Sequence, residues 1–211
     1  MRLRRLAPVL AADLHVPWRE AEFCVLDLET TGLDLRRDQI VSYGAAIIAQ
    51  ARIHCRLSAY GEVRPGRASS VGALKVHGLH SADLAGAPPL DEALDHLIDL
   101  LSNRVLVAHS AWIERAFLDR ALRSRGRRLG PGVLDTAALL RACGLTGGDG
   151  RYAPDLEAIA GRLGLPVHTP HHALGDAITT AEVFLVLATR LEQARPLTVH
   201  HLRTLSRYHR A

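Results

Sequence analysis

Lysine is nearly absent from this sequence of 211 residues: Lys75 is the only one among 26 basic residues, and the other 25 are arginines. Cysteine is also scarce. The three cysteines (Cys24, Cys55 and Cys143) are scattered, which excludes a metal-ligand spacing and a disulfide framework. Cys24 lies inside an apolar run, and we expect it to be a small core residue.

Long apolar runs are missing as well, and no stretch approaches the length of a transmembrane helix. The first residues, 1–5, are basic, but the apolar stretch at 6–14 is short, is interrupted by Pro8 and Asp13, and lacks a convincing cleavage site. We therefore expect no signal peptide and no membrane partner, and a cytoplasmic location.

The composition that remains is that of a globular protein. Hydrophobic residues make up 48% of the chain and charged residues 23%, enough for one sizeable domain with its own core. The net charge is +4 and the pI about 9.3. The planar arginine side chain matches phosphate geometry, so a polyanionic partner is one explanation for the arginine content. The base composition of the genome explains the preference over lysine equally well.

Hydrophobic periodicity predicts an α/β layered domain. Strands are predicted at Phe23–Leu28, Ile40–Ala49, Arg52–Ala59 and Arg104–Ala108, with a hairpin turn at Gln50-Ala51. Helices are predicted at Ser70–Val76, Leu90–Leu101, Trp112–Ser124, Thr136–Cys143, Asp155–Leu163, Ala173–Ala194 and Leu197–Tyr208. Gly147–Gly150 reads as a flexible loop. Residues 1–20 form a basic, partly helical lead-in, residues 21–195 the main domain, and residues 196–211 a basic C-terminal helix.

The stretch "AEFCVLDLETTGLD", residues 21–34, places two carboxylates at the end of a buried strand. Asp27 and Glu29 point to the same face, because side chains alternate along a strand. Burying like charges so close together is costly unless something pairs with them. A divalent cation would satisfy this requirement, and so would an exposed strand end.

Two further stretches place acidic residues at helix starts. In "LVAHSAWIERAFL", residues 106–118, a strand ends at Ala108, Ser110 could cap the following helix, and Glu114 lies in its first turns. In "HTPHHALGDAITTAEVFLVL", residues 168–187, His171 precedes a helix that carries Asp176 in its first turn. The helix dipole alone would also favour an acidic residue there.

Together these stretches resemble the motifs of the DnaQ-like (DEDDh) 3′–5′ exonucleases, a family that includes the proofreading epsilon subunits of bacterial replicative polymerases. "LDLETTGLD" resembles the first motif, "LVAHSAWIERAFL" the second (LVAHNAxFDxxFL) and "HHALGDAITTA" the third (HxALxDAxxTA). The spacing of the third motif selects His171 rather than His172 as its histidine. "KVHGL" at 75–79 and "LDTAALLR" at 134–141 also agree. The resemblance runs in motif order from Phe23 to Leu187.

This resemblance implies a fold and a chemistry. The fold is ribonuclease-H-like, a mixed five-stranded sheet with helices on both faces; one strand is missing from the four predicted above, and it is expected at 127–129 or 133–134. The reaction is phosphodiester hydrolysis at single-stranded 3′ ends with two Mg²⁺ or Mn²⁺ ions. The implied metal ligands are Asp27, Glu29, Glu114 and Asp176; the implied general base is His171; and the implied substrate contacts are Thr30, Thr31, Leu33, His77 and His109. His77 and His109 have two open interpretations: they line the nucleotide pocket, or they are hydrogen-bonded structural residues. A DNA polymerase subunit is an implied partner.

The chain departs from the family pattern at four positions. Glu114 replaces an aspartate, Ser110 an asparagine and Ile113 a phenylalanine, while Gly72 stands where the family has a glutamate before the "VHG" histidine. Glu114 keeps the charge but shifts the carboxylate by roughly 1.5 Å, one C–C bond. Two alternatives to a DNA exonuclease stay open: an exoribonuclease that trims RNA ends, and a degenerate domain that binds nucleic acid or a polymerase without cutting.

Overall fold

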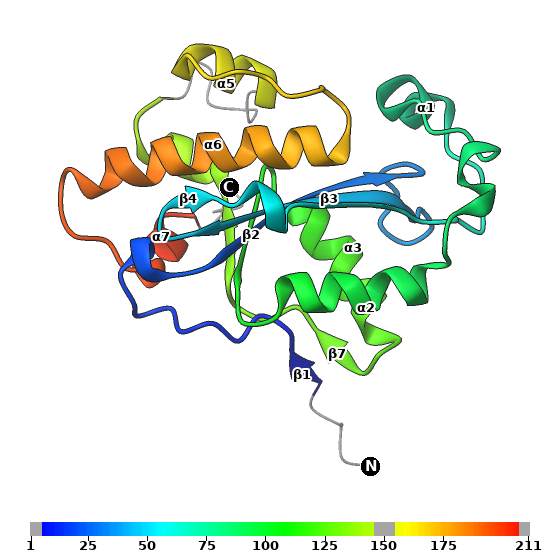
Figure 1. Cartoon of the computed structure of the whole chain (residues 1–211), viewed down its shortest axis with the longest axis horizontal. Helices are drawn as coiled ribbons and strands as arrows, with labels where there is room; N and C mark the ends of the chain where they lie inside the picture. The colour runs from blue at the N-terminus through cyan, green and yellow to red at the C-terminus, as the bar shows by residue number, and fades with distance from the viewer. Residues whose placement is uncertain (1–5, 146–154, 207–211) are drawn as a thin grey trace.

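A mixed sheet forms the centre of the fold in a computed structural model, of which residues 6–145 and 155–206 are described (Figure 1). The predicted loop Gly147–Gly150 lies outside these residues. The strands are β2 (Phe23–Thr30), β3 (Ile40–Ala49), β4 (Arg52–Ile53), β5 (Ala59–Glu62), β6 (Val105–Ala108) and β8 (Val133–Asp135). Their order is β4-β3-β2-β6-β8, with β5 also paired to β3. The β2–β6 and β6–β8 pairs are parallel and the others antiparallel.

The edge of the sheet differs from the prediction. The expected strand Arg52–Ala59 is broken by a 3₁₀ turn at Cys55–Leu57, so β4 and β5 share one edge position, and six strands fill five positions. The hairpin turn is confirmed, since Gln50 and Ala51 both have positive φ (52° and 55°), as a tight turn between twisted strands requires.

The missing strand is β8, the second of the two expected places. The first place, Arg127–Arg128 (β7), pairs instead with β1 (Ala7–Pro8) in a separate two-stranded sheet. The strand β1 and a 3₁₀ turn at Trp18–Glu20 belong to the segment predicted as a partly helical lead-in. Trp18 is buried in the main core, and its backbone N–H donates to Leu197 O.

All seven predicted helices are present, and their described ends lie within three residues of the prediction. They are α1 (Val71–His77), α2 (Leu90–Leu101), α3 (Trp112–Arg123), α4 (Thr136–Ala142), α5 (Leu156–Leu163), α6 (Ala173–Glu192) and α7 (Val199–Leu205). A 3₁₀ turn at Asp83–Gly86 precedes α2. None of the helices in the described part of the chain has the length and hydrophobicity to cross a bilayer.

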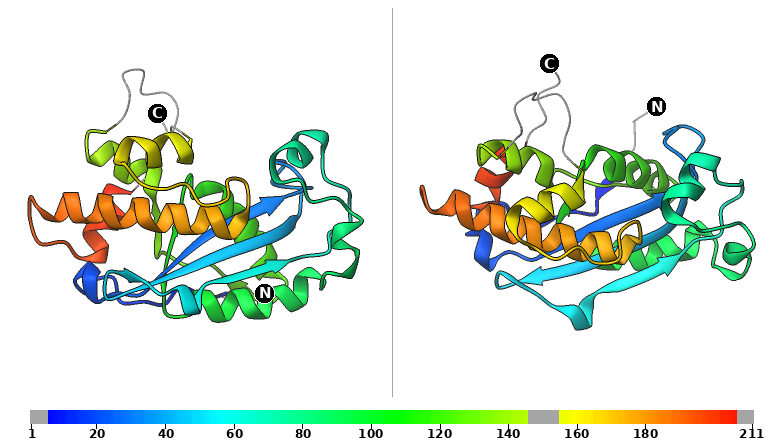
Figure 2. Two further views of the ribbon diagram at one scale, coloured as in Figure 1. Left: turned by 45° about the horizontal axis from the view of Figure 1, so that its top comes forward. Right: turned by 90° about the horizontal axis from the view of Figure 1, so that it is seen from above.

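Helices cover both faces of the sheet, as Figure 2 shows with α6 on one side and α2 on the other. Side-chain alternation along β2 assigns its residues to two cores. Phe23 and Val25 pack with α6 and its neighbours, whereas Cys24 and Leu26 pack with α2 and α3. Asp27 and Glu29 continue the first set, so the sequence directs both carboxylates to the face on which α6 begins.

Gly44 allows α6 to begin directly on the sheet. It pairs with Asp27 across the β2–β3 ladder. A Cβ atom at position 44 would lie 2.1 Å from backbone atoms of Ala173 and Leu174, so only a residue without a side chain fits beneath this helix start. The first turn of α6, with Asp176, is thereby held beside Asp27.

Candidate active site

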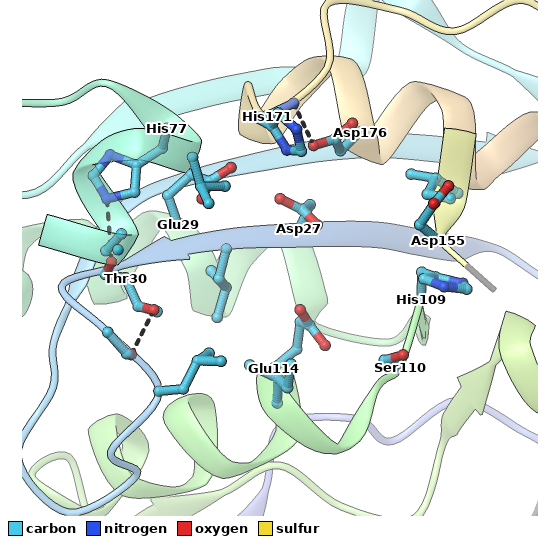
Figure 3. Close-up of a pocket in the computed structure, with 18 of the residues that line it drawn as sticks. Asp27, Glu29, Thr30, His77, His109, Ser110, Glu114, Asp155, His171 and Asp176 are labelled. Atoms are coloured by element: carbon cyan, nitrogen blue, oxygen red, sulfur yellow. Dashed lines mark hydrogen bonds between the residues drawn. The ribbon is translucent and has the colours of Figure 1, made fainter. Parts of the chain in front are cut away.

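Three carboxylates meet where β2 ends and α6 begins (Figure 3). Asp27 and Glu29 come from one face of β2, and Asp176 comes from the first turn of α6. One oxygen from each of them lies within 4.8 Å of the others. The predicted convergence of these three residues is therefore present in the fold.

Burial and mutual repulsion both raise the pKa values of this group. Burial raises the pKa of Asp27 well above its ordinary value, and the charges of Glu29 and Asp176 add to the effect. Burial, followed by the charge of Asp176, raises the pKa of Glu29 to about 7. Burial also raises the pKa of Asp176, although the backbone N–H of His171 donates to Oδ2 at 3.0 Å and opposes the rise. Ionising all three together therefore requires a compensating positive charge.

Glu114 supplies a fourth carboxylate from α3, and its side chain points toward Asp27 in Figure 3. It is only 4% exposed, and its Oε2 is buried without a hydrogen-bond partner among the described residues. Burial raises the pKa of Glu114 well above its ordinary value, and Asp27 contributes next. An orphaned buried oxygen facing three carboxylates fits an oxygen-binding cation such as Mg²⁺ or Mn²⁺. Glu114 lies outside the tight group of three, which suits a ligand that acts through water.

Ser110 does not cap α3, contrary to the expectation. The N-cap position is Ala111, and Ser110 has a left-handed backbone (φ 56°) from which its N–H donates to Asp135 Oδ1 at 3.1 Å. The same oxygen accepts from Ala137 N–H at 2.9 Å and caps α4. Sequence reasoning gave Asp135 no role, although an aspartate directly before an apolar helix is an N-cap signal.

The two candidate histidines lie in different surroundings. His171 lines the cleft above the carboxylates, and its Nε2 is 3.6 Å from Glu157 Oε1. His172 is the N-cap residue of α6 and stacks on the Tyr60 ring, with centroids 4.5 Å apart. Of the two, His171 lines the cleft, and its selection by the motif spacing stays a prediction.

The other two histidines predicted to be in the site, His77 and His109, are hydrogen-bonded to neighbouring residues. His77 accepts from Leu79 N–H at Nδ1, so its Nε2 carries the hydrogen and donates to Thr30 O at 3.2 Å. Burial lowers the pKa of His77, which favours this neutral form. Nδ1 of His109 lies 3.0 Å from the Thr136 hydroxyl. Both side chains line the cleft, but both ring nitrogens of His77 are hydrogen-bonded to the backbone of neighbouring residues.

The turn after β2 divides its residues between the cleft and the interior. Leu33 is 66% exposed and lines the cleft together with Thr30. Thr31 is 0% exposed; its hydroxyl donates to Asp38 Oδ1 at 2.8 Å, and its N–H and C=O are both bonded to other backbone groups. Thr31 therefore supports the turn and does not contact the cleft, in contrast to the expectation.

The cleft between these elements has a volume of about 700 Å³. The helix α1 forms one wall, where Val76 is half exposed, and Ile113 of α3 also lines the cleft. The start of α5, with Asp155 and Leu156, also lines the space. Sequence reasoning missed this last contribution, because a helix start carries no signal of the cavity it faces. The cleft is carboxylate-lined at its base and apolar on its walls.

A sequence profile described as exonuclease (RNase_T) matches residues 24–184, most of the chain. The chain belongs to this exonuclease family. The family resemblance read from the motifs is thus confirmed, and the cluster of carboxylates lies in the matched segment.

Relatives of this chain carry bacterial DNA polymerase III names. It is 36% identical over 191 residues to a DNA polymerase III subunit epsilon-like protein of Rhodobacter capsulatus, covering 89% of this chain and 26% of that protein. It is 29% identical over 194 residues to DNA polymerase III subunit epsilon of Treponema pallidum, covering 92% and 86%. It is 27% identical to the PolC-type DNA polymerase III of Clostridium perfringens, covering 88% of this chain but 12% of that protein. The chain thus spans about a quarter of the first relative and less of the third.

Solved structures similar to this chain have the same fold. Exonuclease X in complex with 5′ overhanging duplex DNA aligns with a TM-score of 0.65 at 22% identity, over 88% of this chain and 99% of that one. Escherichia coli exonuclease I in complex with a dT13 oligonucleotide aligns with a TM-score of 0.71 at 14% identity, over 83% and 42%. The ribonuclease-H-like α/β fold predicted from the motifs is confirmed.

Proposed function

We propose that this exonuclease removes nucleotides from the 3′ end of single-stranded DNA, hydrolysing the terminal phosphodiester bond and releasing nucleoside monophosphates. The observation that carries the proposal is the convergence of Asp27, Glu29, Asp176 and Glu114 at the base of one cleft. We favour DNA over RNA as the substrate because the relatives are named after the epsilon subunit of a DNA polymerase.

The four carboxylates would hold Mg²⁺ or Mn²⁺. Oxygen ligands of this kind favour hard cations, and the raised pKa values of Asp27 and Glu29 reflect the positive charge that the metal-free cluster lacks. Such ions, when bound, would polarise the scissile phosphate and lower the pKa of a bound water. Glu114 would contribute through its buried Oε2, so that the longer side chain is compatible with activity.

His171 would accept the proton of the attacking water on its imidazole ring. Histidine is the usual side chain for proton transfer near neutral pH. The hydrogen bond from its backbone N–H to Asp176 keeps this residue beside the carboxylates, and Glu157 faces its ring from α5.

The apolar walls would receive the terminal nucleotide. Leu33 is exposed at the cleft and would pack against the base, and Val76 and Ile113 supply further apolar lining. The hydrogen bond from His77 to Thr30 O fixes α1 against the turn after β2, so these walls keep their spacing.

A DNA polymerase subunit is the proposed partner, and proofreading the proposed context. The support is the match to subunit epsilon of Treponema pallidum across 86% of that protein. The alternative of a non-cutting domain is less well supported, because Glu114 keeps a buried carboxylate aimed at the cluster, where a degenerate site would have no reason to bury an unpaired charge.

The test is digestion of 5′-labelled single-stranded DNA and RNA of one sequence with Mn²⁺, Mg²⁺ or EDTA. We expect stepwise shortening of the DNA from its 3′ end with either metal and no cutting in EDTA. Asp27→Asn should abolish cutting without unfolding the protein, because it removes charge from a repulsive cluster. Undiminished cutting in EDTA would refute the metal-dependent mechanism. Faster cutting of RNA than of DNA would show that RNA is the substrate. An inactive wild type would favour a domain that binds without cutting.

A further inference from the structure

Two neighbouring hollows lie beside the cleft, along the outer side of α3. Their volumes are about 640 and 470 Å³, and Arg36 and Arg120 line both of them, so they form one continuous surface. Six arginines line this arginine surface: Arg36, Arg37, Arg64, Arg115, Arg120 and Arg123. The only acidic residues among the lining residues are Asp91 and Asp119.

The concentration of positive charge is local. Residues 6–145 and 155–206 contain 20 Lys and Arg against 21 Asp and Glu, so this part of the chain is close to neutral. The arginine surface has more arginines than aspartates even though Arg37 pairs with Asp34 at 3.9 Å and Arg115 with Asp119 at 3.8 Å. A surface with this imbalance attracts polyanions.

The arginines of this surface do different work. Arg120 donates to the backbone oxygens of Leu35 and Asp38 and lies over the Phe117 ring, so it holds the turn after β2. Arg36 and Arg123 are exposed and have no ion-pair partner within the described residues. Their guanidinium groups are available for phosphate oxygens, which they can bind with two parallel hydrogen bonds.

A large aromatic ring is exposed among these arginines. Trp112 is 51% exposed and lines the larger hollow, whereas Trp18, the other tryptophan, is 0% exposed. A half-exposed tryptophan between cationic side chains is the arrangement that stacks bases of a single strand while the cations follow its backbone.

The arginine surface is continuous with the cleft through two segments. In the turn after β2, Leu33 lines the cleft and Leu35 and Arg36 line the larger hollow. At the start of α3, Ile113 lines the cleft and Trp112 lies on the hollow side. A strand leaving the cleft at this end therefore reaches the hollow that Trp112 and Arg36 line.

We propose that the arginine surface binds the part of the substrate strand that lies outside the cleft, with a base stacked on Trp112 and phosphates on Arg36 and Arg123. This inference rests on the proposed function, since it takes the occupant of the cleft to be the end of a nucleic-acid strand. It adds a second binding region, next to the cleft, that distinguishes long strands from short ones.

The test compares binding of a labelled 15-nucleotide single strand with cleavage of a mononucleotide ester, thymidine monophosphate p-nitrophenyl ester, which is small enough to occupy the cleft alone. Binding is measured in an Asp27→Asn background, so that the strand stays intact. Trp112→Ala should weaken binding about 5- to 100-fold, the usual range for removal of one stacking ring. Arg36→Gln with Arg123→Gln should lower the slope of log affinity against log salt by about 1.4, or about 0.7 for each phosphate that is no longer neutralised.

The matched control is Arg56→Gln with Arg195→Gln. Both residues are exposed, and Arg195 follows the end of α6 that is far from the cleft (Figure 1). Because each variant replaces two arginines by glutamines, the control has the same net charge as the test variant. It should bind the 15-nucleotide strand within twofold of its parent. Equal weakening by the control would show a general charge effect and overturn the proposal.

Intrinsic fluorescence gives a second readout. Trp18 is buried, so quenching by added iodide reports on Trp112. The 15-nucleotide strand should protect Trp112 from iodide, and thymidine monophosphate should not. Unchanged strand affinity in both test variants would overturn the proposal and point to another polyanion, such as an acidic protein. Failure of the proposed function would be seen separately as an intact ester with the wild type, because strand binding is measured without cleavage.

Discussion

Replacing Glu29 by glutamine should stabilise the metal-free protein above neutral pH. In the folded protein the pKa of this carboxyl rises to about 7 from its ordinary 4.5, because of burial and the neighbouring Asp176. Below pH 4.5 the carboxyl is protonated in both the folded and the unfolded state, so it has no effect on the free energy of unfolding. Above pH 7 it is ionised in both states, and the folded state bears the full unfavourable interaction.

The size of the effect follows from this difference in pKa. At 1.36 kcal/mol per pKa unit, a rise from 4.5 to about 7 corresponds to about 3 kcal/mol. Solvent at the open side of the cleft screens part of it, which leaves about 2 kcal/mol. For a chain of this length, 1 kcal/mol shifts Tm by about 2–4 °C, so Glu29→Gln should raise Tm by about 4–8 °C at pH 8.

The assay is thermal unfolding followed by circular dichroism at pH 8 and at pH 4.5, both in EDTA. The gain should be present at pH 8 and nearly absent at pH 4.5. Saturating Mg²⁺ should stabilise the wild type more than the variant, because binding to the folded state adds RT ln(1 + [L]/Kd). Glu20→Gln is the control, since Glu20 is exposed and remote from the cluster. A Tm of Glu29→Gln equal to or below that of the wild type at pH 8 would refute the electrostatic account.

Three further predictions concern the site. His171→Asn should lower the cleavage rate about 10²–10⁴-fold, and His172→Asn should lower it little. Asparagine is chosen because it tolerates the left-handed backbone of His171 (φ 60°). The reverse order would place the general base at His172. Glu114→Gln should remove nearly all activity and Glu114→Asp should keep a substantial part, because charge matters more than reach for a ligand acting through water; full activity of Glu114→Gln at matched Mn²⁺ and Mg²⁺ would remove Glu114 from the site. Gly44→Ala should lower the free energy of unfolding in urea by about 1–3 kcal/mol or more and weaken Mg²⁺ binding, because the new Cβ displaces the start of α6. Gly86→Ala is the control, since nothing lies within 4 Å of the added atom. Equal behaviour of the two variants would contradict this explanation.

Much of the site was predictable because it depends on local periodicity. Alternation along β2 fixes the common face of Asp27 and Glu29, and the helix start after Pro170 fixes Asp176 in a first turn. These are short-range properties, and the motif spacing adds His171. The predicted metal ligands therefore lie together in the fold, whereas their roles in catalysis stay predictions.

The errors arise where long-range contacts override local signals. Thr31 turns inward because Asp38, seven residues later, accepts its hydroxyl hydrogen bond. Ser110 adopts a left-handed backbone to reach Asp135, which lies on a neighbouring strand end. The edge strand breaks at Cys55–Leu57, although its residues have no turn signature that would mark the break. For Ser110 in particular, the position of the partner is set only by the complete fold.

The contact of Gly44 with the start of α6 also bears on how the sequence can diverge. The spacing between Asp27 and Asp176 is set there by two main chains in van der Waals contact, rather than by the sizes of the side chains around them. Exchanges among the apolar residues elsewhere between β3 and α6 can repack without changing that spacing. The arrangement of the carboxylates is thereby insulated from drift in the core.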